Sequence, residues 1–164
     1  MRRTMVVFAI LIIICASVRF ATAGDKIDIP KVITKSDVEK ILGVPVKDAK
    51  GHNKNGSGGY YESEWSYYGV KGDKGLYFDV LYAGQDAPPH LTQTMFSMLP
   101  ADKSKSTPVN GLGDKAIFCP KESGMAMLHV LKGDTLITIG FHGHVTDAVL
   151  DSEKAMATKI LANL

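Results

Sequence analysis

The sequence predicts an α+β fold: an antiparallel sheet built from two β-hairpin-plus-helix units, with the helices packed on the sheet. Residues 60–68 and 76–83 alternate aromatic or apolar with polar side chains, which is typical of strands. Residues 125–131 and 135–141 are apolar runs separated by a Gly133-Asp134 pair, a strong signal for a tight hairpin turn. A stretch with helical spacing follows each hairpin and completes the unit.

A faint internal repeat relates the two units. The tripeptide Lys71-Gly72-Asp73 recurs as Lys132-Gly133-Asp134, at an offset of 61 residues. At this offset the alternating apolar positions of residues 76–80 fall on those of residues 137–141, so both sets lie on one face of a strand. We therefore expect the two hairpins to share one sheet and one core.

Three helices are expected. Ser36-Asp37-Val38-Glu39 has the form of a capping box and opens a short helix that runs to Leu42, where Gly43 ends it. Residues 90–99 form a second helix that Pro100 ends, and a third runs from Thr146 to about residue 164.

The remaining segments have the composition of connections. Residues 24–32 are expected to be an extended lead-in. Residues 51–59, with the sequence GHNKNGSGG, are expected to be a flexible loop, and residues 101–113 a second loop.

The first 23 residues have the form of a secretory signal peptide. Arg2 and Arg3 precede an uninterrupted apolar run over residues 6–16, and Ala21-Thr22-Ala23 is an A-x-A cleavage site. This run is too short for a membrane-spanning helix, which needs about 20 residues. We expect residues 1–23 to be a signal peptide and residues 24–164 to be a single exported domain, periplasmic or extracellular. After cleavage it would have no stable membrane anchor; the alternative is an uncleaved anchor.

Charge and cysteine content exclude several classes of protein. The 19 basic and 17 acidic residues form no long block of like charge, so nothing indicates nucleic-acid binding. Cys15 leaves with the signal peptide, which leaves Cys119 without an intramolecular disulfide partner, and the fold must rest on packing. Cys119 is flanked by apolar residues and is expected to be buried; the alternatives are a surface thiol and a catalytic nucleophile.

Short motifs are spread along the chain. Leu42-Gly43-Val44-Pro45 ends the first helix, and Gly111-Leu112-Gly113-Asp114-Lys115-Ala116 precedes a strand, a Lys-Gly-Asp hairpin and a C-terminal helix. In these features the chain resembles small exported bacterial α+β domains of unknown function with a PsbP-like fold. The resemblance implies a non-catalytic periplasmic binding or accessory domain, and it carries over no functional residues.

The second hairpin presents a candidate metal site. If Gly133-Asp134 is a two-residue turn, Met125, Met127, His129 and His142 share the face opposite the core, with Met125 directly across from His142. Thioether and imidazole ligands in this combination favour copper. The alternative is that a second layer of structure covers this face and the methionines are ordinary core residues.

The first hairpin presents a candidate ligand or partner surface. Tyr60, Tyr68 and Tyr77 lie on its outward parity, and tyrosine offers a large apolar body with a polar tip. The alternative is that these rings pack against a helix. Glu62 and Glu64 share the outward face but form no acid–base pair, because nothing in the sequence is placed to desolvate them.

No catalytic signature or cofactor motif appears in the sequence. Gly111-Leu112-Gly113 lacks the third glycine and the flanking elements of a phosphate-binding loop, so turn geometry accounts for it. The sequence therefore predicts an exported, non-catalytic accessory or binding domain with no cofactor and an unknown protein or small-molecule partner. The alternative is a periplasmic metal-binding protein of the copper type that uses the Met/His face.

Overall fold

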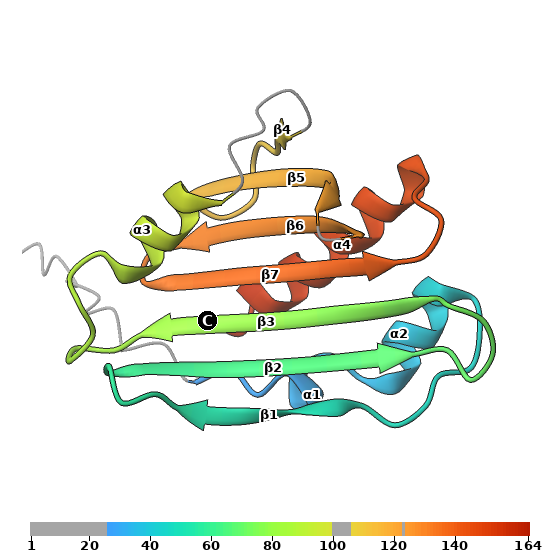
Figure 1. Ribbon diagram of the computed structural model, residues 1–164, viewed down its shortest axis with the longest axis horizontal. Helices are drawn as coiled ribbons and strands as arrows, with labels where there is room; N and C mark the ends of the chain where they lie inside the picture. The colour runs from blue at the N-terminus through green and yellow to red at the C-terminus, as the bar shows by residue number, and fades with distance from the viewer. Residues whose placement is uncertain (1–25, 100–105, 123) are drawn as a thin grey trace, which may run out of the picture.

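The centre of the fold is a seven-stranded antiparallel sheet in the order β1-β2-β3-β7-β6-β5-β4 (Figure 1). The computed structural model describes residues 26–99, 106–122 and 124–164; the predicted signal peptide lies outside these ranges. The α+β class predicted from the sequence is confirmed. The strands are β1 (Lys50–Asn55), β2 (Tyr60–Tyr68), β3 (Gly75–Ala83), β4 (Thr107–Pro108), β5 (Lys115–Glu122), β6 (Met125–Lys132) and β7 (Thr135–His142).

The two predicted hairpins, β2–β3 and β6–β7, lie side by side in this sheet. Lys132 pairs with Thr135, so Gly133-Asp134 is the two-residue turn that the sequence predicted. The predicted register of β6 and β7 is also confirmed, since Leu128 pairs with Ile139. β3 pairs antiparallel with β7 and joins the two halves of the sheet.

The helices of the described residues lie on two faces of the sheet (Figure 1). α1 (Ile29–Val32), α2 (Lys35–Leu42) and α4 (Asp147–Leu161) cover one face, here called the back face. α3 (Leu91–Met98) packs against β3, β6 and β7 at one end of the opposite, front face. The helices that follow the two hairpins, α3 and α4, lie on opposite faces of the sheet. The finer description of the fold as two equivalent hairpin-plus-helix units is therefore not confirmed and stays a prediction.

The hydrophobic core lies between the back face and its three helices. Alternate side chains of the central strands point into it, and Phe78, Leu128 and Ile139 are fully buried there. Val38 of α2 and Ile160 of α4 are fully buried from the other side. Burying a side chain of this size contributes about 1.5–3 kcal/mol, so this layer provides most of the stability of the fold.

β1 occupies most of the segment that was predicted to be a flexible loop. It pairs with β2 from Lys50 opposite Ser66 to Asn55 opposite Tyr61. All of its side chains are exposed, so no hydrophobic alternation marks it as a strand. The prediction of a loop was wrong because an edge strand needs backbone pairing but not an apolar face.

A polar hub holds β1 to its neighbours. The Asn53 amide nitrogen donates a hydrogen bond to Asp28 at 2.9 Å. The Asn53 carbonyl oxygen accepts hydrogen bonds from Ser63 Oγ at 2.7 Å and from Trp65 Nε1 at 3.0 Å. Ser63 is fully buried, and its Oγ also accepts a hydrogen bond from the Ile29 N–H at 3.0 Å. One asparagine thus links β1, β2 and the start of α1.

The predicted lead-in contains the short helix α1 instead of a purely extended segment. Pro30 lies in its first turn, where the missing N–H of proline costs nothing. Ile29 and Ile33 are fully buried, and the Ile33 carbonyl oxygen accepts a hydrogen bond from the Tyr67 hydroxyl at 2.9 Å. Burial of the two isoleucines bends the chain into a helical turn.

The N-cap of α2 lies two residues before the predicted Ser36, and the helix uses a different capping box. Thr34 is the N-cap: its hydroxyl accepts from the Asp37 N–H at 3.2 Å, and the Asp37 carboxylate accepts from the Thr34 N–H at 2.9 Å. The predicted Ser36–Glu39 box was wrong, because Glu39 accepts from the Val46 N–H. Lys159 of α4, 2.6 Å from Asp37, is the main cause that lowers the pKa of Asp37 to about 2.

The other two predicted helices are present with shorter bounds, as α3 and α4. Thr146 occupies the N-cap position of α4 as predicted, although its side chain makes no cap hydrogen bond. None of the helices in the described part of the chain combines the length and apolarity needed to cross a bilayer.

Candidate functional site

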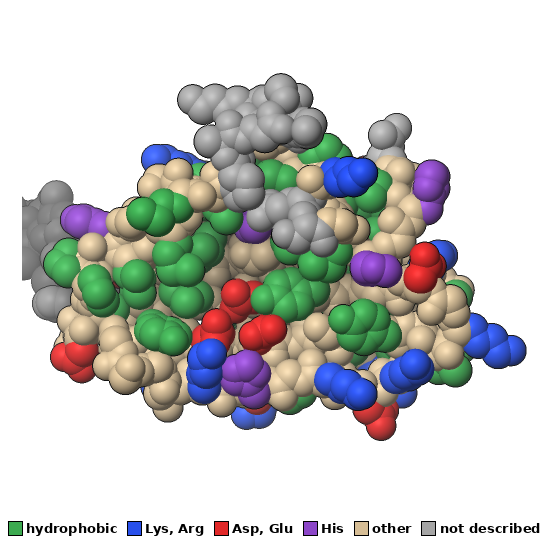
Figure 2. All heavy atoms as spheres, viewed as in Figure 1, with side chains coloured by type: hydrophobic (Ala, Val, Ile, Leu, Met, Phe, Trp, Pro, Cys, Tyr) green, Lys and Arg blue, Asp and Glu red, His purple; other side chains and the backbone are tan. Residues whose placement is uncertain are grey.

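A row of polar side chains crosses the front face of the sheet. Successive strand pairings align His52, Glu64, Asp79, Thr138 and His129 on β1, β2, β3, β7 and β6. These positions have the parity opposite to that of the core residues. Figure 2 shows acidic side chains gathered near the middle of this face, with a lysine and a histidine beside them. The helix α3 covers only one end of the face (Figure 1).

Three potential metal ligands converge at the β1–β2 end of this row. His52, Glu62 and Glu64 each offer one ligand atom, and these atoms lie within 4.8 Å of one another. Glu62 Oε2 lies 2.5 Å from Lys54 Nζ and 3.8 Å from His52 Nε2. In the described part of the chain, this is the one group of three or more His, Cys, Asp or Glu side chains with such spacing.

Asp79 adds a third carboxylate, and we call Glu62, Glu64 and Asp79 the acidic cluster. Asp79 pairs with Glu64 across β2 and β3. Its Oδ1 atom is inaccessible to solvent and has no hydrogen-bond partner among the described residues. Burial, and then repulsion from Glu62 and Glu64, raises the pKa of Asp79 to about 7. A cation bound at the acidic cluster would therefore offset both the cost of burying the Asp79 charge and the repulsion among the three carboxylates.

The three predicted tyrosines share the front-face parity but are spread along the face. Tyr60 and Tyr68 lie at opposite ends of β2, roughly 27 Å apart at the usual rise of a strand. Tyr68 is exposed, whereas Tyr77 is partly buried near the middle of the front face. Burial raises the pKa of the Tyr77 hydroxyl, and the charge of Asp79 adds to this effect. Tyr77 lies two residues from Asp79 on β3 and Tyr60 lies two residues from Glu62 on β2, so both adjoin the acidic cluster.

The two methionines of the predicted metal site lie close together. The Sδ atoms of Met125 and Met127 lie 3.5 and 3.6 Å from the position that a Cβ atom on Gly140 would occupy. A Cβ atom there would make only ordinary van der Waals contacts, so the two thioethers flank this position of β7 without depending on glycine. Cys119 of β5 pairs with Met127 and is buried, as the sequence predicted.

The two histidines of that predicted site have other partners. His129 is buried, and its Nδ1 lies 3.1 Å from Thr138 Oγ1. His142 is exposed, and its Nδ1 is hydrogen-bonded to the carbonyl oxygen of Asp73 in the β2–β3 connection. Both thioethers therefore lie beside Gly140, while both imidazoles contact groups outside the predicted ligand set.

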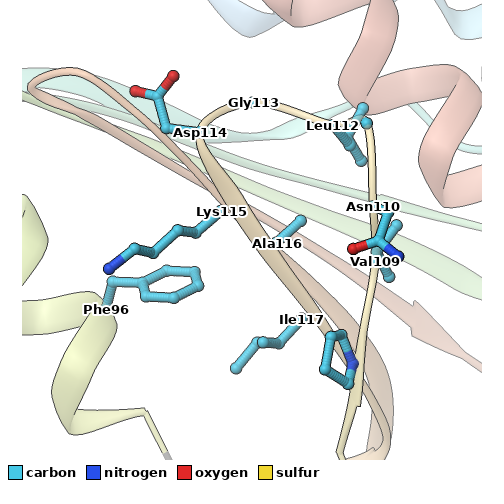
Figure 3. A pocket seen from close by; sticks show the side chains of 11 residues that line it. Phe96, Val109, Asn110, Leu112, Gly113, Asp114, Lys115, Ala116 and Ile117 are labelled. Carbon is cyan, nitrogen blue, oxygen red and sulfur yellow. The ribbon is translucent and has the colours of Figure 1, made fainter.

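A pocket of about 340 Å³ lies between α3 and the loop before β5 (Figure 3). Phe96 lines one side, and residues 108–117 line the rest. Gly111 and Gly113 have φ values of 76° and 62°, so they serve as turn residues, as predicted. Asp114 accepts from Lys132 Nζ at 2.8 Å and from the Gly133 N–H at 2.7 Å. The carboxylate of this loop thus supports the β6–β7 turn.

A further acidic side chain is buried on the other side of the sheet. Glu153 of α4 is fully buried, and no hydrogen-bond partner satisfies its carboxylate oxygens among the described residues. Burial raises the pKa of Glu153 to about 9, and the nearby Phe141 backbone offsets only part of this effect. Its place between Val149 and Met156 on the buried stripe of the helix was the sequence signal for its burial.

Sequence reasoning missed His52 and Asp79 as site residues and set aside Glu62 and Glu64. The available signal was the alternation of His52-x-Lys54 before Glu62-x-Glu64, which would place all four side chains on one face of a hairpin. The composition of the first of these segments predicts a loop, which hides this alternation.

No match to this chain is found among protein-family models, curated proteins or solved structures.

Proposed function

We propose that the protein is an exported, non-catalytic binding domain whose front face binds a positively charged ligand. The observation that carries this proposal is the acidic cluster, in which three carboxylates share one lysine, Lys54. Partly buried charges of one sign raise the free energy of the folded state unless an opposite charge compensates them. A cation that binds here would supply that compensation.

The front face also suits a binding role by its place in the fold. The back face is filled by the core and three helices, so its side chains are committed to stability. The acidic cluster is partly exposed: Glu62 has 15% of its side chain exposed, and the adjoining His52 has 48%. A ligand can therefore reach the cluster without opening the core.

Binding of cations can be tested by amide NMR with spermidine, a lysine-rich peptide and divalent metal ions as probes. At least one probe should shift the amides of β1–β3 saturably, and the double variant Glu62→Gln/Glu64→Gln should lose this response. Asp151→Asn, an exposed change on α4, serves as the control and should leave it intact. If no probe shifts these amides, or the double variant responds like the wild type, the proposal fails.

Export is supported by the predicted signal peptide and by the resemblance to exported PsbP-like domains. Protein recovered after secretion should begin at Gly24, which N-terminal sequencing or intact mass would show. Recovery of folded, exported protein that still begins at Met1 would contradict the expected cleavage.

A copper-binding role for the Met/His face is the second candidate, favoured by the two Sδ atoms that both lie beside Gly140. Copper(I) is a soft ion that accepts thioether ligands. Anaerobic copper(I) titration should show binding that weakens in Met127→Leu, a change that keeps volume but removes the sulfur. Equal affinity in the variant would remove this candidate, and His142→Ala would test whether the imidazole takes part.

A further inference from the structure

We propose that His52, Glu62 and Glu64 form a binding site for a divalent transition-metal ion, with zinc as the ion of first choice. This inference rests on the proposed function, because it names the cation that the front face binds. The three donors come from two adjacent strands. Their side chains leave the same face because His52 pairs with Glu64, and Glu62 lies two residues from Glu64.

The spacing of the donors fits a single ion after small movements. The three ligand atoms already lie within 4.8 Å of one another. Donors that share a tetrahedral zinc ion at about 2.1 Å lie about 3.4 Å apart. Rotation of side chains closes this difference, and His52, on the edge strand with 48% of its side chain exposed, is free to rotate.

The donor chemistry selects the class of ion. One imidazole nitrogen and two carboxylate oxygens suit zinc and its first-row neighbours. Calcium and magnesium prefer sets made of oxygen alone, so an imidazole contributes little to their binding. We therefore expect zinc to bind more tightly than calcium, and the difference to depend on His52.

A second observation at the same place points to a bound cation. Asp79 Oδ1, across the strand pair from Glu64, is inaccessible to solvent and lacks a hydrogen-bond partner among the described residues. Buried polar atoms in folded proteins are nearly always satisfied. An ion beside Glu64, or a water molecule on that ion, would satisfy this oxygen.

Lys54 acts as a built-in competitor for the ion. Its ammonium group lies 2.5 Å from Glu62 Oε2, one of the three donors, and so supplies a positive charge to the cluster. A metal ion must displace this contact to bind Glu62. Lys54→Gln should therefore increase the affinity for zinc severalfold. If the Lys54–Glu62 contact served only to hold the site together, the same change would instead lower this affinity.

The test is titration of the purified protein with zinc by calorimetry in metal-free buffer, with calcium in parallel. His52→Ala and Glu64→Gln should each weaken zinc binding by roughly tenfold or more. His144→Ala, which removes an exposed histidine outside the cluster, and Asp151→Asn should not change it. Thermal unfolding without metal shows whether each variant is folded.

The outcomes separate this inference from the proposed function. Absence of zinc binding, or an affinity that His52→Ala leaves unchanged, overturns the metal site. If spermidine or the lysine-rich peptide still binds at the cluster in that case, the proposed function stands without it. If neither the metal nor the organic cations bind there, both proposals fail.

Discussion

Glu153 is a residue whose ionisation opposes folding at neutral pH. Its pKa is about 9 in the folded protein and 4.5 when exposed, so between these values the folded state keeps a proton that the unfolded state has lost. Stability should therefore fall as the pH rises from about 4.5 to about 9 and then level off. Glu153→Gln should raise the free energy of unfolding at pH 7 by on the order of 3 kcal/mol.

Urea unfolding of the wild type and of Glu153→Gln at several pH values between 5 and 9 measures this effect. The two stability curves should diverge steadily as the pH rises. The neighbouring exposed change Asp151→Asn should follow the wild type. Parallel curves for the wild type and Glu153→Gln would show that the carboxyl group titrates normally.

Two consecutive residues of β7 report on which face supplies the stability. Ile139 is fully buried on the back face, so Ile139→Ala should cost about 2–5 kcal/mol. Thr138 is on the front face, where it contacts His129, so Thr138→Ala should cost only about 0.5–1.5 kcal/mol. Chemical denaturation measures both values. Equal losses would be inconsistent with the observed register.

At the level of elements, β1 depends on one side chain. Asn53 bonds to Asp28, Ser63 and Trp65, and its removal leaves the buried Ser63 hydroxyl without that acceptor. Asn53→Ala should destabilise the protein by about 1–3 kcal/mol and speed amide exchange in β1 and α1. Hydrogen-exchange mass spectrometry locates the effect. Asn163→Ala, at the end of α4, is the matched control, and equal exchange in the two variants would contradict the role of Asn53.

Elements with a local apolar pattern were predictable from the sequence, and those that depend on partners distant in the sequence were not. The β6–β7 turn and register follow from the Gly133-Asp134 pair and strict alternation. β1 carries no apolar residue that points to a core, and α1 has a single turn that depends on burial of Ile29 and Ile33. Both need partners distant in sequence, which a local pattern does not contain.

The same difference explains the candidate site. Met125 and Met127 were placed on a common face because their hairpin is local, and the structure keeps them there. The approach of His52 to Glu62 and Glu64 required β1 to be recognised. The raised pKa of Asp79 depends on its burial and on the neighbouring carboxylates, so it can be recognised only once the whole front face is known.

As a whole molecule, the described part of the chain should unfold in one cooperative step. All seven strands form one sheet, and one core on the back face joins side chains from both halves of the chain. Differential scanning calorimetry should show a single transition whose calorimetric and van't Hoff enthalpies agree. Addition of reductant should not shift it. Two separated transitions would contradict the shared core.

The pairing of β3 with β7 has a consequence for the order of folding. Leu76 meets Phe141 and Val80 meets Ile137, so this central pair joins segments far apart in the sequence. β1–β3 can pair locally as soon as they are synthesised, but the inner edge of β3 stays open until β7 is available, and α4 covers the back face later still. Contacts of such long range slow folding, because a large loop must close before they form. The described sheet is therefore complete only after β7 has been synthesised, and a nascent chain that ends before residue 135 carries a β3 whose inner edge is unpaired.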